Sequence, residues 1–561
     1  MVTSPALLLI LGALPVPLLP GRVRSAWMVV LPIAALALLW SMPEGTTGGL
    51  TLLGLSLEPV RVDSLARVFA TAFCLAALLA VIYGLTVRDR MQQVAILVYA
   101  GSAIGGSLAG DLVTLFVFWE LTGLSSVFLI WARRTERSYR AGMRYLAAQV
   151  ISGLLMLAGI ALQVSDGSGV RFDYIGADAP GGMLILTAIG IKCAFPVLHA
   201  WLQDTYPEAT AVGTVVLSGL TTKLAIYALA RGYPGTDMLV WVGVTMACFP
   251  IFYAVIENDL RRVLSYSMIN QLGFMVVGIG IGGALGINGA AAHAFADIFF
   301  KGLLFMSMGA VLTRVGTVKA TELGGLYKSM PQTTVLCMVG AASISAFPLF
   351  SGFVTKSLIL ESVADEHRTV VWLLMLFASA GVFHHAGIKI PFFAFFAHDA
   401  GHRVPEAPLS MRVAMGLAAA ISIGIGVMPG VLYGLLPFAV DYVPYTASHV
   451  INQLQLLGLA AMAFTVLMRT GLYPPELHSV NLDADVVYRR LLPGVWRGGQ
   501  RSVAQLRDRL GPHVETGLAG VATLVTRPFR AEGGLGSPWS TSGMVRWAVL
   551  LLGIVLLFSY F

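Results

Sequence analysis

GIKCAFPVLHAWLQDTYPEATAVGTVVLSGLTTK, residues 190–223, is an apolar stretch that carries Lys192 and Lys223 on either side of a Pro-bounded polar segment. A lysine inside a membrane span costs about 2.5–3.5 kcal/mol on insertion scales. A span interrupted by proline frees backbone groups that must line a cavity or meet partners, which is the usual setting of a transport site. The stretch therefore predicts that both lysines have a function inside a membrane.

The composition excludes a soluble globular protein. The chain has 561 residues, of which 57% are hydrophobic and 12% charged, and its mean hydropathy is +0.80. Its 61 glycines suit helices that pack closely in lipid, whereas a β-barrel needs alternating segments of about ten residues. We therefore predict an all-α polytopic membrane protein.

The motifs of cofactor enzymes are missing from the sequence. Cys74, Cys193, Cys248 and Cys337 lie in apolar runs without CxxC or Cys/His spacing, so we expect them to pack in the core and to form neither a metal site nor a disulfide framework. A nucleotide-binding loop and a haem CxxCH are also missing, so we expect no cofactor and no catalytic chemistry of the chain's own. A redox partner or an opposing ion gradient must then supply the energy.

Apolar runs of about 17–25 residues predict sixteen spans. Their approximate limits are 3–20, 25–42, 63–86, 91–109, 112–132, 143–164, 182–204, 209–231, 238–257, 263–283, 289–313, 332–362, 370–396, 410–436, 450–468 and 543–561. Residues 3–20 have no basic region before them, and we interpret them as the first helix rather than a signal peptide.

The basic residues between the spans predict the orientation. With the N-terminus outside, the arginine clusters at 22–24, 88–90, 133–140 and 261–262 all face the cytoplasm, as the positive-inside rule requires. The same rule explains the net charge of +7, so no nucleic-acid partner is expected. The expected location is the inner (plasma) membrane of a bacterial cell.

We predict five regions: residues 1–90 as N-terminal helices, 91–257 and 263–396 as two repeats, 410–468 as C-terminal helices, and 470–561 as a surface segment with a terminal span. The last region contains an amphipathic pattern, predicted to be broken or kinked at Gly511 and Pro512, that describes a helix along the membrane surface. It either tethers the last span or braces neighbouring subunits. Its apolar positions are Val503, Leu506, Leu510, Val514, Leu518, Val521 and Val525, opposite Arg507, Arg509 and Glu515.

Charged residues inside the predicted spans are candidates for transport. Glu120 lies mid-span, where a carboxylate must be partnered or protonated. His293, Asp297 and Lys301 follow at i, i+4 and i+8, on one helical face. Such a face indicates either a proton relay or a self-neutralising polar seam that joins helices. For any one charge, a residue that snorkels from a helix end is the simpler alternative.

An internal repeat is predicted from the lysines. Lys192 and Lys223 are 31 residues apart, and Lys356 and Lys389, again in or after a Pro-interrupted span, are 33 apart. Spans 4–8 and 9–13 would form the two copies, and because five is odd they must have inverted topology. His384 and His385 either join the second copy or face a loop or lipid.

These motifs resemble the antiporter-like family shared by the proton-pumping subunits of respiratory complex I, the D and A subunits of Mrp sodium/proton antiporters and the membrane subunits of energy-converting hydrogenases. The resemblance covers about residues 60–470. Its motifs are DLVTLFVFWELTGLSS, IKCAFPVLHAWLQD, VLSGLTTKLAIYALAR, NDLRRVLSYSMINQLGF, HAFADIFFKGLLF and AFPLFSGFVTK.

The resemblance implies two inverted five-helix repeats with discontinuous seventh and twelfth spans. It implies that Glu120 is the acidic partner of a titrating Lys192 and that Lys223 connects them to a central relay of His293 and Lys301. Lys356 would be the terminal lysine of the second half. Asp297 stands where many members have a second His, a departure associated more with D-type subunits. The NLDADVVYRR stretch and the extra terminal helix also resemble longer D-like or hydrogenase-linked members.

The leading hypothesis is a proton-translocating subunit of a multisubunit Na⁺/proton antiporter, with other membrane subunits, the lipid bilayer, protons and Na⁺ or another monovalent cation as partners. The first alternative is a pumping subunit of a complex I-like or hydrogenase-type oxidoreductase. The second is a scaffold subunit with a vestigial channel.

Overall fold

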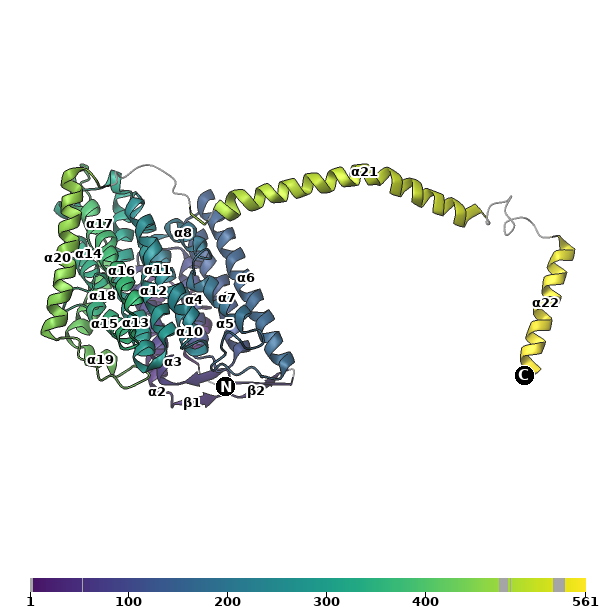
Figure 1. Ribbon diagram of the computed structural model, residues 1–561, viewed down its shortest axis with the longest axis horizontal. Helices are drawn as coiled ribbons and strands as arrows, with labels where there is room; N and C mark the ends of the chain where they lie inside the picture. Colours follow the sequence, from purple (N-terminus) through teal and green to yellow (C-terminus); the bar gives the residue numbers. More distant parts are fainter. Residues whose placement is uncertain (1–3, 53, 474–482, 485, 528–539, 561) are drawn as a thin grey trace. The chain divides into compact units, whose positions relative to one another are not determined.

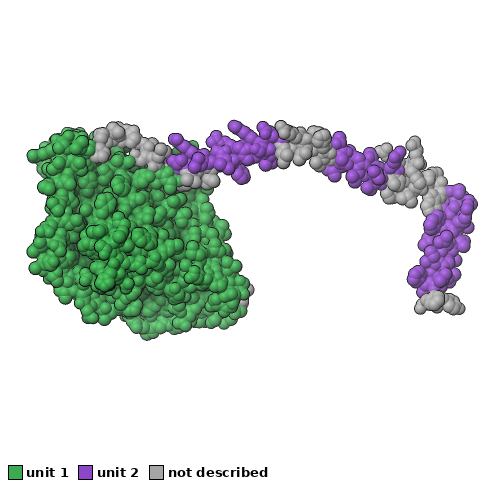
Figure 2. Space-filling view, in the orientation of Figure 1, with its two compact units in different colours: residues 1–484 green, residues 485–561 purple. Residues whose placement is uncertain are grey.

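The computed structural model of the chain describes residues 4–52, 54–473, 483–484, 486–527 and 540–560, and most of these residues are helical (Figure 1). Contacts divide the chain into two units, Met1–Ala484 and Asp485–Phe561 (Figure 2). The first unit contains the following helices: α1 Pro5–Gly12, α2 Gly21–Ser41, α3 Ser64–Tyr83, α4 Arg90–Ser107, α5 Leu112–Trp131, α6 Glu136–Asp166, α7 Gly182–Cys193, α8 Ala200–Thr205, η1 Tyr206–Glu208, α9 Ala211–Gly219, α10 Thr221–Gly232, α11 Asp237–Ile256, α12 Leu260–Ile281, α13 Gly283–Val315, η2 Ala320–Glu322, η3 Leu326–Lys328, α14 Pro331–Ile344, α15 Ser351–Asp365, α16 Thr369–Val382, η4 Phe383–Ile388, α17 Lys389–Pro391, η5 Phe392–Phe396, α18 Leu409–Val427, α19 Pro429–Tyr433 and α20 Ala447–Thr470.

Twelve helices in the described part of the chain are long and apolar enough to cross a membrane. The all-α membrane fold is confirmed, but the predicted count of sixteen is not. Four predicted spans, 3–20, 91–109, 182–204 and 332–362, are missing from the twelve. The first becomes the eight-residue helix α1 followed by turns, and the second becomes α4. The last two are broken into the pairs α7/α8 and α14/α15.

The two breaks share the sequence AFP and have positive φ at the same two positions. The first contains AFPV, with positive φ at Ala194 (62°) and Val197 (70°), and the second contains AFPL, with positive φ at Ala346 (56°) and Leu349 (74°). Left-handed backbone is unfavourable for residues with a Cβ atom, by roughly 1–2 kcal/mol each. The predicted discontinuous helices are therefore present, and they are strained at matching positions.

A second pair of matching features lies at helix N-termini. Asp111 caps α5 and forms an isolated antiparallel bridge with Arg171; Asp259 caps α12 and forms the same bridge with Lys319. Each bridge joins residues 60 apart, since 171 − 111 and 319 − 259 both equal 60. Each copy therefore contains five spans in the same order: α4, α5, α6, α7/α8 and α9/α10 in the first, and α11, α12, α13, α14/α15 and α16–η5 in the second.

The two copies are inverted. The backbone N–H of Glu58, beside the short strands, donates to Asp111, so the capped end of α5 lies at the strand end of the bundle. Arg261, next to the capped end of α12, donates to the Pro207 carbonyl of η1, directly after α8. Figure 1 shows the strands and α8 at opposite ends of the bundle.

Residues 43–62, between α2 and α3, add a small β element to the fold. Strand β1 Gly45–Thr47 pairs with β4 Val60–Val62, and β2 Leu50–Leu52 pairs with β3 Leu55–Leu57, both antiparallel.

The second unit contains η6 Val487–Leu491, α21 Leu492–Thr526 and α22 Thr541–Tyr560. The helix α21 is continuous across residues 511–512, so the predicted break there is wrong. Four of its apolar positions are exposed, namely Val503, Leu518, Val521 and Val525. The side chains of Leu506, Arg507, Arg509, Leu510, Val514 and Glu515 lie outside the described residues.

Candidate functional site

Seven of the eight predicted transport residues are fully buried, and Glu120 is partly buried. The buried ones come from α7, α10, α13, α15 and α17: Lys192, Lys223, His293, Asp297, Lys301, Lys356 and Lys389. Because buried charges are tolerated only with partners, the neighbours of each one indicate what it can do.

Lys192, near the end of α7, is held by α5. Its ammonium donates to the carbonyl of Trp119 and, at 2.8 Å, to the hydroxyl of Thr122. It also lies 4.4 Å from the centroid of the Trp119 ring, within the range of a cation–π contact. The break directly after α7 therefore presents this ammonium to α5.

Glu120 follows Trp119 on α5 and points towards α6. Its Oε1 is buried without a hydrogen-bond partner among the described residues. Gly153 of α6 leaves the room for it, because a Cβ atom at that position would overlap Oε1. The predicted partners Glu120 and Lys192 thus flank the same turn of α5, with the lysine bonded to α5 itself.

The two repeats are joined at Lys223 and Asp297. The Lys223 ammonium of α10 lies 2.6 Å from Asp297 Oδ2 of α13, and both side chains are fully buried. The same ammonium donates at 3.0 Å to the carbonyl of Ser218, which the interruption between α9 and α10 at Leu220 leaves free of a helical partner. This ion pair connects the first repeat to the second.

The predicted face of α13 contacts several helices. Lys301 donates to Ser267 of α12 at 2.8 Å, whereas Asp297 pairs with α10 and His293 contacts both α12 and α15. The ion pair between Asp297 and α10 is compatible both with a relay and with a polar seam that joins helices.

Lys356 of α15 lies beside the second break. Its ammonium donates at 3.2 Å to the carbonyl of Ile344, the last residue of α14, and lies 4.9 Å from the Phe274 ring centroid. Lys389 lies in the single α turn between the π-helical turns η4 and η5. It donates to the carbonyls of Ala254, Val255 and Glu257, and so holds the C-terminal end of α11. Of the predicted lysines, Lys389 is the one whose contacts are those of an anchor.

His384 and His385 lie in η4. The His385 ring is fully buried with neither nitrogen hydrogen-bonded within the described part of the chain, and His384 packs on Phe464 and Tyr473. Neither of them contacts the line of charges through a hydrogen bond among the described residues.

Sequence reasoning missed a carboxylate–imidazole pair at the first break. Asp483 accepts from His199 Nε2 at 3.0 Å and from the Tyr266 hydroxyl at 2.7 Å. Partial burial opposes ionisation of Asp483, but hydrogen bonds from His199 and Tyr266 hold its pKa below the usual range. His199 lies between α7 and α8, and Asp483 belongs to the NLDADVVYRR stretch. The sequence signal that could have indicated this pair is a histidine in an interrupted span together with an acid in that stretch.

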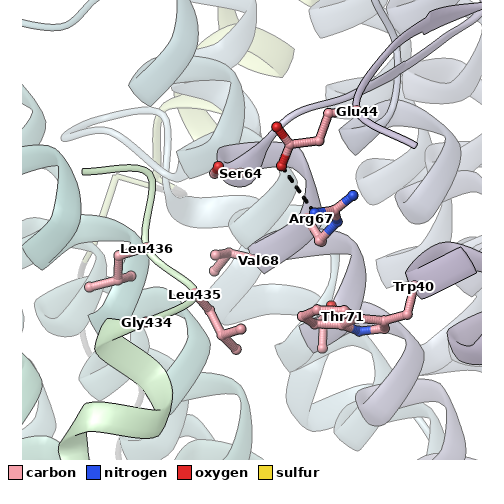
Figure 3. Close-up of a pocket in the computed structure, with 9 residues that line it drawn as sticks. All are labelled: Trp40, Glu44, Ser64, Arg67, Val68, Thr71, Gly434, Leu435 and Leu436. Carbon is pink, nitrogen blue, oxygen red and sulfur yellow. Dashed lines mark hydrogen bonds and ion pairs between the residues drawn. The ribbon is translucent and has the colours of Figure 1, made fainter. Parts of the chain in front are cut away.

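Outside the line of charges, the described residues form a cavity but no metal cluster. Among the described residues there is no cluster of three or more His, Cys, Asp or Glu that could hold a metal. A cavity of about 160 Å³ lies between α3, the end of α2 and the loop after α19, where Arg67 points to Glu44 above Trp40 (Figure 3). None of the predicted transport residues lines this cavity.

Comparison with known proteins relates the chain to one family. Residues 109–383 match the family described as NADH:quinone oxidoreductase/Mrp antiporter, TM. The A subunit of the Na⁺/H⁺ antiporter of Alkalihalophilus pseudofirmus is 28% identical over 473 residues, which are 73% of this chain and 58% of that protein. The D subunit of the Na⁺/H⁺ antiporter of the same organism is 32% identical over 309 residues, 50% of this chain and 62% of that protein. The chain thus spans less than two thirds of each relative.

A solved structure shares the fold. The Mrp complex from Dietzia sp. DQ12-45-1b contains a chain that superposes with a TM-score of 0.78 at 24% identity, over 98% of this chain and 66% of that chain. The family match and the two relatives support the membership of this chain in the antiporter-like family of membrane-complex subunits, which includes those of NADH:quinone oxidoreductases and Mrp antiporters, and the solved structure shows the shared fold.

Proposed function

We propose that the chain is a proton-translocating subunit of a multisubunit monovalent cation/proton antiporter in the bacterial plasma membrane, with Na⁺ as the first cation to test. The observation that carries the proposal is the buried Lys223–Asp297 pair, which links the Lys192 half to the Lys356 half. Two relatives named as Na⁺/H⁺ antiporter subunits support the choice of cation.

The proposed mechanism is electrostatic. When the Glu120 carboxylate approaches Lys192, it stabilises the ammonium; when the two move apart, the desolvated lysine releases its proton towards Lys223. Moving one charge across about 100 mV involves roughly 2.3 kcal/mol, which a change in the partner of one buried ion can supply.

Beyond Lys223, the proton passes to Asp297 and then to the residues of α13 and Lys356. In this proposal residues 91–232 and 237–396 form the two half-channels, so α11, which the predicted boundaries 91–257 and 263–396 put in the first repeat, is part of the second. Residues 1–90 and 410–468 pack beside the half-channels, and residues 470–561 extend to neighbouring subunits. Lys389 would hold α11 in place, because its bonds are to three backbone carbonyls.

The test uses the complete complex with its native partner subunits in everted vesicles. A pulse of NaCl should release accumulated protons, and Lys192→Met and Lys356→Met should each abolish this release while the complex still assembles. Normal release in both variants would reject the proposal. Iron–sulfur absorbance in the purified complex would instead assign the chain to a redox-driven pump.

A further inference from the structure

The buried amide of Asn270 has its orientation set by two helices. Its Nδ2 donates to the carbonyls of Ala247 in α11, at 2.5 Å, and Ala378 in α16, at 3.5 Å. Carbonyl oxygens can only accept, so Asn270 Oδ1 must face the other way. There it accepts from Gln271 Nε2 at 2.5 Å.

The orientation of Asn270 fixes that of Gln271. With its Nε2 on Asn270, the Gln271 amide turns its oxygen to His293, and Gln271 Oε1 lies 3.0 Å from His293 Nε2. An amide oxygen only accepts, so His293 Nε2 must carry a proton in both charge states of the ring. All three side chains are fully buried, which makes an unpaired alternative costly.

The other ring nitrogen meets a group that can donate or accept. His293 Nδ1 lies 3.0 Å from the Thr355 hydroxyl, which lies 2.9 Å from the carbonyl of Ser351. The hydroxyl has one proton, so it donates either to Nδ1 or to Ser351. It donates to Nδ1 when the ring is neutral; when Nδ1 is protonated, the hydroxyl turns to Ser351 and accepts from Nδ1.

We propose that His293 takes up and releases its proton at Nδ1 alone, and that Asn270, Gln271 and Thr355 are positioning residues that enforce this. Gln271 and Asn270 keep the Nε2 proton in place, and rotation of the Thr355 hydroxyl accommodates the proton that binds to and leaves Nδ1. One proton enters and one leaves per cycle, and Thr355 keeps its own. The transport test of this proposal rests on the proposed function, whereas the spectroscopic test does not.

Several charged groups face His293: the ammonium groups of Lys223 on α10, Lys301 on α13 and Lys356 on α15, with Asp297 one turn away on α13. The neighbouring rings of Phe274 and Phe300 are uncharged. None of these groups changes in the variants below, so a shift between variants reports on the hydrogen bonds alone.

Thr355→Val and Thr355→Ser form a matched pair for transport, since only the serine keeps the hydroxyl. Hydrogen bonds to a charged group are about twice as strong as neutral ones, so losing the hydroxyl disfavours the imidazolium more than the neutral ring. In the complete complex we expect the pH midpoint of Na⁺-driven proton movement to fall by about one unit in Thr355→Val, a tenfold change in proton affinity, and to stay at the wild-type value in Thr355→Ser. An unshifted midpoint in Thr355→Val, or an equal shift in both, would overturn the role of Thr355.

The tautomer of the neutral His293 ring can be tested without a transport measurement. In the ¹⁵N-histidine-labelled complex in liposomes, magic-angle-spinning NMR difference spectra against His293→Gln should show the neutral ring with its proton on Nε2. In Gln271→Leu the proton should move to Nδ1, where Thr355 can accept it. A neutral wild-type ring protonated on Nδ1 would refute the inference, whatever the transport assays give. Normal transport in Lys192→Met and Lys356→Met would refute the proposed function and leave the NMR result standing.

Discussion

The two lysines beside the AFP breaks are held alike, but from opposite sides of their break. Lys192 lies two residues before Ala194, and Lys356 lies ten residues after Ala346. Each ammonium donates to a backbone carbonyl and lies over an aromatic ring, at 4.4 Å for Lys192 and 4.9 Å for Lys356. The two ammonium groups therefore have similar surroundings although the lysines occupy different positions relative to their breaks.

The halves differ in the group that opposes the lysine. The first half has a carboxylate, Glu120, in the space left by Gly153. In the second half, the residue preceding Lys356 is Thr355, which is bonded to the imidazole of His293. Lys192 thus has a carboxylate from its own half beside it, whereas Lys356 is influenced by Asp297, the partner of Lys223, and follows a threonine that is bonded to His293.

The largest effect on stability is expected at the Lys223–Asp297 pair, where the two halves meet. Lys223→Met or Asp297→Leu alone leaves an unpaired buried charge and should destabilise the complex by about 3–5 kcal/mol. The double variant removes both charges and should recover most of that loss. Thermal unfolding of the purified complexes measures both, and additive losses in the double variant would argue against a direct pair.

Replacing Glu120 by glutamine (Glu120→Gln) tests the function of the carboxylate in the first half. It should lower Na⁺-driven proton release about 100-fold, the scale of a lost proton-transfer group, with little change in stability because Oε1 makes no hydrogen bond in the described part of the chain. Gly153→Ala should act in the same direction, since its methyl group would meet Oε1. Gly416→Ala, on α18 with nothing within 4 Å of the added carbon, is the matched control. Full activity in Gly153→Ala would show that the space beside Glu120 is not used.

Asp483 is bonded to His199 at the first break, and the stability that this contact contributes should depend on pH. Because the hydrogen bonds lower the pKa of Asp483 from 3.8, the ionised contact contributes stability above that value and loses it as the pH falls through the folded pKa. Asp483→Asn should therefore cost about 1–2 kcal/mol at pH 7, and the difference from wild type should shrink below about pH 4. Melting curves of the complex at both pH values test this, and a difference that grows in acid would contradict the assignment.

The smallest effect concerns the strain shared by both breaks. Val197 and Leu349 adopt positive φ and are more than half exposed, so a glycine at either position removes strain and little packing. Val197→Gly and Leu349→Gly should each stabilise the complex by about 1 kcal/mol. Unequal effects in a melting assay would show that the breaks are not equivalent.

Much of this arrangement could be predicted from the sequence, because charges are rare in an apolar chain and Pro-interrupted spans stand out. The interruptions near Pro196 and Pro348 predicted the two broken helices, and the lysine spacing predicted the inverted repeats. The span count was less predictable, because hydropathy does not show that residues 3–20 form a short helix and turns, or how a broken span is divided.

The hydrogen bonds of the site could not be predicted. The pairing of Lys223 with Asp297 depends on how α10 packs against α13, and the contact of Asp483 with His199 joins residues 284 positions apart. Asn270 and Gln271 carry no charge, so the sequence gives no reason to single them out. Their role follows from which carbonyls surround them.

The most direct test of the account is proton movement in the Lys223→Met/Asp297→Leu double variant. In everted vesicles that contain the complete complex, we predict that this variant assembles to near wild-type levels and releases no protons on a NaCl pulse, because the connection between the halves is lost. Proton release at the wild-type rate in the assembled double variant would contradict a proton path through the buried pair.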